Sequence, residues 1–285
     1  MPERKSTSRP TVLLFDIGGV CVVSPFQAIL DYEKACGIPP GWVNYSISAT
    51  NPNGSWQKLE RGEILLDADF FREFKTDLSN ESRWRTYYAR YFAATRKEKL
   101  SDGAEEAAYN VPPVPDIDAE KMYWTMMSMA REPDPFMYPA LKKLRAAADK
   151  SNGRLIIGAL SNTSIFPPGH PFNDETTQAG KTNKELKGLF DIFVSSAHVG
   201  MRKPDEDIYR YAITRLHEFV KLKYGGDGVR VEDITFLDDI GTNLRTARKL
   251  GMNTIKVQLG RADKAVLELE KITGLSLRDE QRAKL

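Results

Sequence analysis

Five short runs of apolar residues recur along the chain, and the first four stop at polar residues. The runs cover Thr11–Phe15, Arg154–Leu160, Ile192–Val194, Ile234–Leu237 and Thr254–Leu259. Because they are short, continuously apolar and separated by helical segments, they predict strands of a parallel sheet buried on both faces. Alternating strands and helices predict an α/β domain with a Rossmann-like, doubly wound sheet. Ligands bind such sheets outside the carboxyl ends of the strands, which is where the polar residues gather.

The segment between the first and second predicted strands has a different pattern. Residues 25–134 contain several stretches with helical spacing and no clear strand run. We therefore expect an α/β core in residues 11–24 and 135–275, interrupted by an α-helical cap in residues 25–134. A helical domain inserted at this edge would form a lid over the site. Residues 1–10 and 276–285 are expected as tails.

Two further segments are informative within this plan. A cluster of methionine and aromatic residues runs from Met122 to Met129 in the expected cap. It fits either the interior of the cap or an apolar pocket, since methionine adapts to irregular shapes. The connection from Ser164 to Lys187 is rich in loop-forming residues. It is expected as a flap beside the site or as a disordered insertion.

Composition narrows the class of protein. The 285 residues are enough for one large domain or two small ones. With 41% hydrophobic and 28% charged residues, the chain has an ordinary globular composition that excludes wholesale disorder. A formal net charge of +2 provides no field to attract nucleic acid. No apolar run reaches the roughly 18 residues of a membrane span, and nothing indicates an oligomeric state.

Cysteine usage and the last residues bear on the compartment. Cys21 and Cys36 are too few for a disulfide framework and have no metal-binding spacing, which fits a reducing compartment. Both are expected in the core. The final tripeptide, Ala283-Lys284-Leu285, resembles the Ser-Lys-Leu peroxisomal signal. We therefore expect a cytoplasmic protein, or a peroxisomal one if the source is eukaryotic.

Four polar motifs follow the predicted strands in order, and together they resemble one superfamily. The motifs are Phe15-Asp-Ile-Gly-Gly-Val20, Leu160-Ser-Asn162, Arg202-Lys-Pro-Asp205 and Phe236-Leu-Asp-Asp-Ile-Gly-Thr-Asn243. They resemble the four motifs of the haloacid dehalogenase (HAD) superfamily, and the inserted segment resembles its helical C1-type cap. Within that superfamily, the chain is similar to the N-terminal phosphatase domain of soluble epoxide hydrolases and to related domains fused to acyl-CoA dehydrogenases. The resemblance extends from about Thr11 to Gly274.

Asp16 is the candidate nucleophile. Its carboxylate can attack phosphorus and form an aspartyl-phosphate, which splits hydrolysis into two displacements. Such an attack brings an anion toward a dianion, and Mg²⁺ held by oxygen ligands offsets the repulsion. The resemblance implies that the carboxylates of Asp16 and Asp239 and the backbone carbonyl of Gly18 bind Mg²⁺, with Asp238 close by.

Other motif residues are candidates for holding a small phosphorylated substrate. Ser161 can donate its hydroxyl to a phosphoryl oxygen beside the backbone N–H of Asn162, and Lys203 can neutralise the transferring group. The resemblance also implies a phosphate-binding role for Gly19. For Asn243 two roles remain open, because it can orient the second acidic residue or cap the following helix.

Gly18 departs from the superfamily pattern, which usually has an aspartate two residues after the nucleophile. Glycine keeps a carbonyl for a metal but cannot transfer a proton, and general acid–base help is typically worth about 10² to 10⁴ in rate. Three functions therefore remain open. The first is a phosphatase whose substrate has a good leaving group or whose acid comes from elsewhere. The second is a haloacid-dehalogenase-type hydrolase, against which Asp238 and Asp239 argue. The third is a protein that binds a phosphorylated ligand or a partner without turnover.

Overall fold

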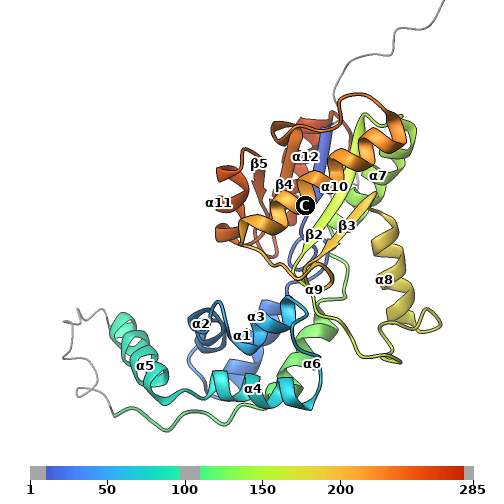
Figure 1. The fold of residues 1–285 in the computed structure, drawn as a ribbon. Helices are drawn as coiled ribbons and strands as arrows, with labels where there is room; N and C mark the ends of the chain where they lie inside the picture. The colour runs from blue at the N-terminus through green and yellow to red at the C-terminus, as the bar shows by residue number, and fades with distance from the viewer. Residues whose placement is uncertain (1–10, 97–109, 279–285) are drawn as a thin grey trace, which may run out of the picture. The chain divides into compact units, whose positions relative to one another are not determined.

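Five parallel strands form a single sheet in the computed structural model, which describes residues 11–96 and 110–278 (Figure 1). They are β1 (Thr11–Phe15), β2 (Leu155–Ser161), β3 (Ile192–Ser195), β4 (Ile234–Asp238) and β5 (Asn253–Lys256). Their order across the sheet is β3-β2-β1-β4-β5. The predicted α/β fold class with a doubly wound parallel sheet is therefore confirmed. The direction of the strand order reverses at β1, where open α/β sheets bind their ligands.

Helices cover both faces of this sheet. They are α7 (Met137–Lys150), α8 (Gln178–Gly188), α9 (Ser196–Val199), α10 (Glu206–Tyr224), α11 (Gly241–Lys249) and α12 (Ala262–Thr273), with a 3₁₀ turn at Val231–Asp233. Because side chains alternate along a strand, Leu13 and Phe15 of β1 pack with α7 and α12, whereas Val12 and Leu14 pack with α10 and α11. Burial on both faces explains why the strand sequences are continuously apolar.

The inserted segment forms a second, all-helical unit. Its helices are α1 (Pro25–Ala35), α2 (Trp42–Ala49), α3 (Ser55–Glu60), α4 (Ala68–Leu78), α5 (Glu81–Arg96) and α6 (Ala119–Met129). The unit comprises Pro25–Leu59 and Glu63–Met129, while Glu60–Gly62 group with the α/β unit. Met122, Tyr123 and Met126 are buried inside the helical unit, so this part of the cluster is interior packing, while Met127 and Met129 are half-buried. The lid role of this unit stays a prediction.

Several expectations outside the sheet need correction. Cys36 is exposed, because it follows the end of α1 instead of lying on a packed face. The connection after Ser164 is not irregular throughout, since Thr177 caps the N-terminus of α8 and a helix follows. The chain also packs beyond residue 275: Leu277 is 1% exposed in the core, and its N–H donates to Glu270 Oε1.

Some expectations concern parts of the chain that lie outside the described residues. These are the N-terminal tail at residues 1–10 and the tripeptide at 283–285. The compartment therefore stays a prediction. Within residues 11–96 and 110–278, no helix combines the length and the apolar character needed to cross a membrane.

Candidate active site

Three carboxylates meet where β1 and β4 end. The two strands are neighbours, with Phe15 paired to Leu237, and the N–H of Asp16 donates to the carbonyl of Leu237 at 2.8 Å. This register brings Asp16 beside Asp238 and Asp239, and one carboxylate oxygen from each of the three lies within 4.8 Å of the others. Residues more than 220 positions apart thus form one acidic cluster at the reversal point of the sheet.

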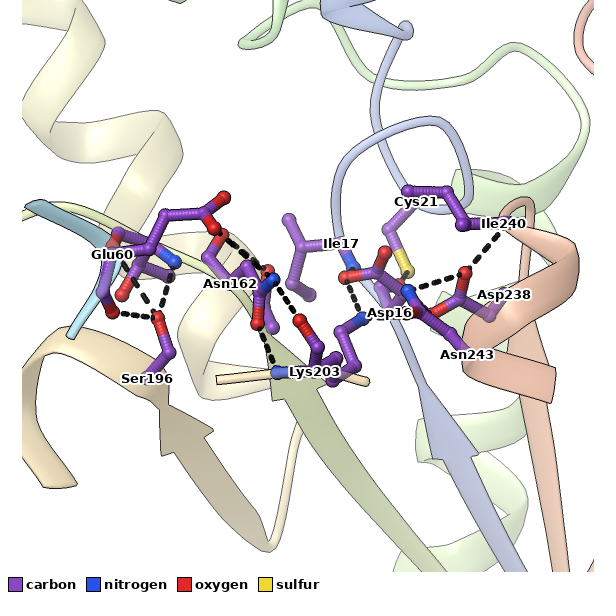
Figure 2. A network of polar contacts seen from close by, with 12 residues as sticks. Asp16, Ile17, Cys21, Glu60, Asn162, Ser196, Lys203, Asp238, Ile240 and Asn243 are labelled. Carbon is purple, nitrogen blue, oxygen red and sulfur yellow. Dashed lines mark hydrogen bonds and ion pairs between the residues drawn. The ribbon is translucent and has the colours of Figure 1, made fainter. Parts of the chain in front are cut away.

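Lys203 supplies the positive charge of this cluster. Its Nζ lies 2.9 Å from Asp16 Oδ1 and 2.7 Å from Asp238 Oδ2, and its side chain is 1% exposed (Figure 2). Burial alone would lower the pKa of the Lys203 ammonium, but the two carboxylates raise it above its ordinary value. The ammonium is therefore held charged in the interior by its two anionic partners.

Asp238 is the most firmly held of the three acids. Besides Lys203, its carboxylate accepts the N–H of Ile240 at 2.7 Å and the side-chain amide of Asn243 at 3.0 and 3.1 Å. Asn243 thus orients Asp238, the first acid of the pair and not the second. It does not cap α11 either, because Ile240 occupies the N-cap position and Asn243 lies inside the first turn.

Asp16 is held at both its side chain and its backbone. The N–H of Ile17 donates to Asp16 Oδ1 at 2.6 Å, and the thiol of Cys21 donates to the Asp16 carbonyl at 3.3 Å. Burial raises the pKa of Asp16 to about 6, although the Lys203 ammonium acts against the rise. Cys21 is in the core as expected, and it also supports the loop that follows Asp16.

Gly19 lets the chain pass close to the third acid. Its φ is +73°, and a Cβ built on it would lie 2.5 Å from Asp239 Oδ2, so a side chain here would collide with the Asp239 carboxylate. Burial raises the pKa of Asp239 to about 8, and the carboxylates of Asp16 and Asp238 add to the rise. Gly18 belongs to the same turn and bridges to Val22.

Ser161 is the last residue of the neighbouring strand β2, and Asn162 follows it. The Ser161 hydroxyl donates to the Asn162 carbonyl at 3.4 Å, and no contact joins it to the three acids within the part of the chain that the structure describes. The Asn162 amide instead binds the backbone of Lys203, accepting from its N–H at 2.8 Å and donating to its carbonyl at 3.0 Å. Asn162 therefore holds the backbone of Lys203, while the Lys203 ammonium contacts the acids.

Two residues without a predicted role, Glu60 and Arg202, join this network. Glu60 Oε2 lies 2.7 Å from Arg202 Nε. It also lies 3.4 Å from the Asn162 amide nitrogen (Figure 2). Glu60 had no sequence signal, because it ends an ordinary helical stretch 142 positions before its partner. Arg202 stands beside Lys203 in the motif, but its charge alone does not reveal what it binds.

The donor set fits a hard divalent cation. Three carboxylates and one ammonium carry two net negative charges when all are ionised, and oxygen ligands are those that Mg²⁺ prefers. Burial raises the pKa of Asp239, and the two neighbouring carboxylates raise it further, so ionising Asp239 without a cation is unfavourable. A cation at this cluster would remove that cost.

Comparisons with known proteins identify relatives that align with nearly the whole chain. Bifunctional epoxide hydrolase 2 of Sus scrofa is 37% identical over 268 residues, which are 93% of this chain and 39% of that protein. Acyl-CoA dehydrogenase family member 10 of Mus musculus is 25% identical over 265 residues, 93% of this chain and 19% of that protein. The chain thus spans well under half the length of either relative. No protein-family profile matches the sequence.

A solved structure shares the architecture. A predicted HAD-like family hydrolase from Porphyromonas gingivalis aligns over 91% of this chain and 97% of its own, with a TM-score of 0.51 and 19% sequence identity. At that sequence identity, the match is evidence for a shared fold alone. The chain therefore has the fold of HAD-like hydrolases, and the resemblance to this superfamily predicted from the four motifs is confirmed.

Proposed function

We propose that this chain is a Mg²⁺-dependent hydrolase that cleaves small phosphate esters through a covalent intermediate on Asp16. The observation that carries the proposal is the ammonium of Lys203 between Asp16 and Asp238, with Asp239 in the same cluster. This arrangement combines a carboxylate nucleophile, a fixed cation and a set of oxygen ligands. Those are the parts that phosphoryl transfer to a carboxylate requires.

The contacts of Asp16 indicate which oxygen attacks. Ile17 N–H and Lys203 Nζ both bind Oδ1, so we assign the attack to Oδ2. A bond forms between Oδ2 and phosphorus while the bond from phosphorus to the leaving oxygen breaks. Water then hydrolyses the aspartyl-phosphate and restores the carboxylate. Lys203 stabilises the anionic phosphoryl group throughout, because its neighbours keep it protonated.

The metal is assigned to Asp16 and Asp239, together with the carbonyl of Gly18. Asp238 is already bound by Lys203, Ile240 and Asn243, so its proposed role is to hold Lys203 in place. When bound, Mg²⁺ would offset the charge that the acids and the phosphoryl group bring together. The proposed phosphate contacts are the Ser161 hydroxyl and the backbone around Asn162 and Gly19.

Gly18 restricts the substrate class. Without a carboxyl group at this position the leaving oxygen receives no proton from the residue that usually supplies it. We therefore assign the activity to esters with good leaving groups, such as acyl phosphates or sugar-1-phosphates. The same residue favours one second candidate, a protein that binds a phosphorylated ligand without turnover. A dehalogenase is disfavoured, because displacing a halide does not require the acid cluster at Asp238 and Asp239.

The deciding experiment is a screen of phosphorylated metabolites with and without Mg²⁺, on wild type and Asp16→Asn. Turnover that needs both Mg²⁺ and Asp16 supports the proposed hydrolase. Binding of Mg²⁺ and inorganic phosphate without any turnover supports the binding protein instead. Metal-independent chloride release from 2-chloropropionate would contradict both and support the dehalogenase.

A further inference from the structure

Glu60 lies in the inserted segment of the sequence, yet it contacts the α/β unit. It ends α3, but residues Glu60–Gly62 group with the α/β unit in the fold. The carbonyl of Glu60 accepts the hydroxyl of Ser196 at 2.6 Å. A Cβ at Gly62 would lie only 2.2 Å from the carbonyl oxygen of Ala197, so this short turn is packed directly against α9.

The Glu60 side chain reaches the segment that carries Lys203. Its Oε2 lies 2.7 Å from Arg202 Nε, and both side chains of this ion pair are 13% exposed. Arg202 directly precedes Lys203, so the ion pair holds the backbone next to Lys203 in place. An ion pair so little exposed is screened weakly by water, so removing one of its partners is costly.

A second path runs through Asn162. Its amide binds both backbone groups of Lys203, at 2.8 and 3.0 Å, and the nitrogen of the same amide lies 3.4 Å from Glu60 Oε2 (Figure 2). The Glu60 carboxylate and the Lys203 carbonyl both attract that nitrogen, which keeps the amide oxygen on the Lys203 N–H. Glu60 therefore acts on the backbone of Lys203 from two sides.

We infer that Glu60 is a positioning residue: through Arg202 and Asn162 it holds the backbone of Lys203 so that Nζ lies between Asp16 and Asp238. The inference rests on the proposed function, because Glu60 can affect catalysis only if the Lys203 ammonium takes part in it. Glu60 itself does not touch the reacting groups. Glu60 affects the position of the Lys203 ammonium, and a displacement of a catalytic group by about 1 Å is enough to lower the rate.

The kinetic test uses Glu60→Ala, the conservative Glu60→Gln and a matched control. Arg145→Ala is the control, because Arg145 is 15% exposed and pairs with Asp191 at 3.1 Å elsewhere in the α/β unit. We expect Glu60→Ala to lower kcat about 10- to 100-fold with KM changed less than about threefold, as for residues that orient a primary ligand. Glu60→Gln keeps an oxygen acceptor for Arg202 and Asn162 and recovers most of kcat.

Arg145→Ala lowers thermal stability but leaves kcat near that of wild type. If Glu60→Ala behaves like Arg145→Ala, losing stability while keeping kcat, the positioning role is wrong and the proposed hydrolase stands. If Glu60→Gln is as impaired as Glu60→Ala, the acceptor path through Asn162 is wrong.

A second readout does not depend on turnover. Lys203 is 1% exposed, so an amine-reactive acetylating reagent should label it slowly in the folded wild type, compared with Lys249, which is 73% exposed. We expect Glu60→Ala to raise the labelling rate of Lys203 at least about tenfold, measured by peptide mass spectrometry, and Arg145→Ala to leave it unchanged. Unchanged protection in Glu60→Ala overturns the inference even if wild type hydrolyses no phosphate ester.

Discussion

Asp16 and Asp238 share one cation, since Lys203 Nζ lies 2.9 Å from the first and 2.7 Å from the second. The two acids come from neighbouring strands, and the lysine comes from the segment between α9 and α10. Because Asp239 adds a third carboxylate, the single ammonium cannot neutralise the cluster. The same arrangement that holds Asp16 therefore also leaves an excess of negative charge that suits a divalent cation.

Replacing Lys203 with methionine should destabilise the fold strongly. The substitution leaves two buried carboxylates without their shared partner, and breaking a buried ion pair from one side typically costs about 3–5 kcal/mol. The free energy of unfolding, measured with urea at pH 8, is the test. Lys249→Met is the control, because Lys249 is 73% exposed and its loss should cost less than about 0.5 kcal/mol. An equally small loss for Lys203→Met would show that the carboxylates are not ionised around it.

Asp16→Asn should abolish hydrolysis without weakening the fold. The amide cannot act as nucleophile, so we expect a loss of at least about 10³-fold in kcat. Since burial raises the pKa of Asp16 to about 6, ionising this residue in the folded protein is unfavourable, and its neutral replacement removes that cost. The expected combination is an inactive protein with an unchanged or higher melting temperature in metal-free buffer. Substantial residual activity would contradict the role of Asp16.

The sequence predicts the sheet well, because each strand carries its own signal. Thr11–Phe15 is a run of apolar residues ended by Asp16, and β1 has the same bounds. In contrast, the partner of Glu60 depends on a turn docking onto α9, with nothing in the local pattern to mark it. The role of Asn243 was ambiguous for a related reason. Whether its amide caps a helix or binds an acid depends on where α11 begins relative to Asp238.

Gly19→Ala should strain the backbone and, in addition, displace the carboxylate of Asp239. Any L-residue is strained at φ +73°, which costs of order 1–3 kcal/mol, and the new Cβ would also meet Asp239 Oδ2 at 2.5 Å. Gly274→Ala is the matched control, since its φ is +69° and nothing lies within 4 Å of its Cβ. We expect both variants to lose stability, but only Gly19→Ala to lose Mg²⁺ affinity, measured by isothermal titration calorimetry. Equal Mg²⁺ affinities in the two variants would place the metal away from Asp239.

Mg²⁺ binding should strengthen as the pH rises from 6 to 8. The pKa of Asp239 is raised to about 8 and that of Asp16 to about 6, both from an ordinary value of 3.8. Between the ordinary pKa of 3.8 and the raised values, the folded protein binds more protons than the unfolded chain. The free energy of unfolding without metal therefore falls as the pH rises through this range. A metal ligand must be deprotonated, so Mg²⁺ binding should release protons over the same range. Calorimetry at pH 7 in two buffers of different ionisation enthalpy checks this, and identical heats in both would contradict it.

Gly18→Asp should extend hydrolysis to esters with poor leaving groups. Unlike Gly19, Gly18 does not have a positive φ, so an aspartate is conformationally allowed in this half-buried turn. We expect the rate with an alkyl phosphate to rise about 10²-fold, the lower end of what general acid–base catalysis contributes. The rate with p-nitrophenyl phosphate should change little, because that leaving group needs no proton.

Gly18→Asn separates proton transfer from mere occupancy of the turn. Asparagine has nearly the same shape as aspartate but cannot donate and recover a proton in this pH range. It should therefore leave the alkyl phosphate rate as low as in wild type. If both substitutions change that rate alike, another group already supplies the proton, and the restriction to good leaving groups is wrong. If only Gly18→Asp raises it, the missing carboxyl group at position 18 is what limits the wild-type chain.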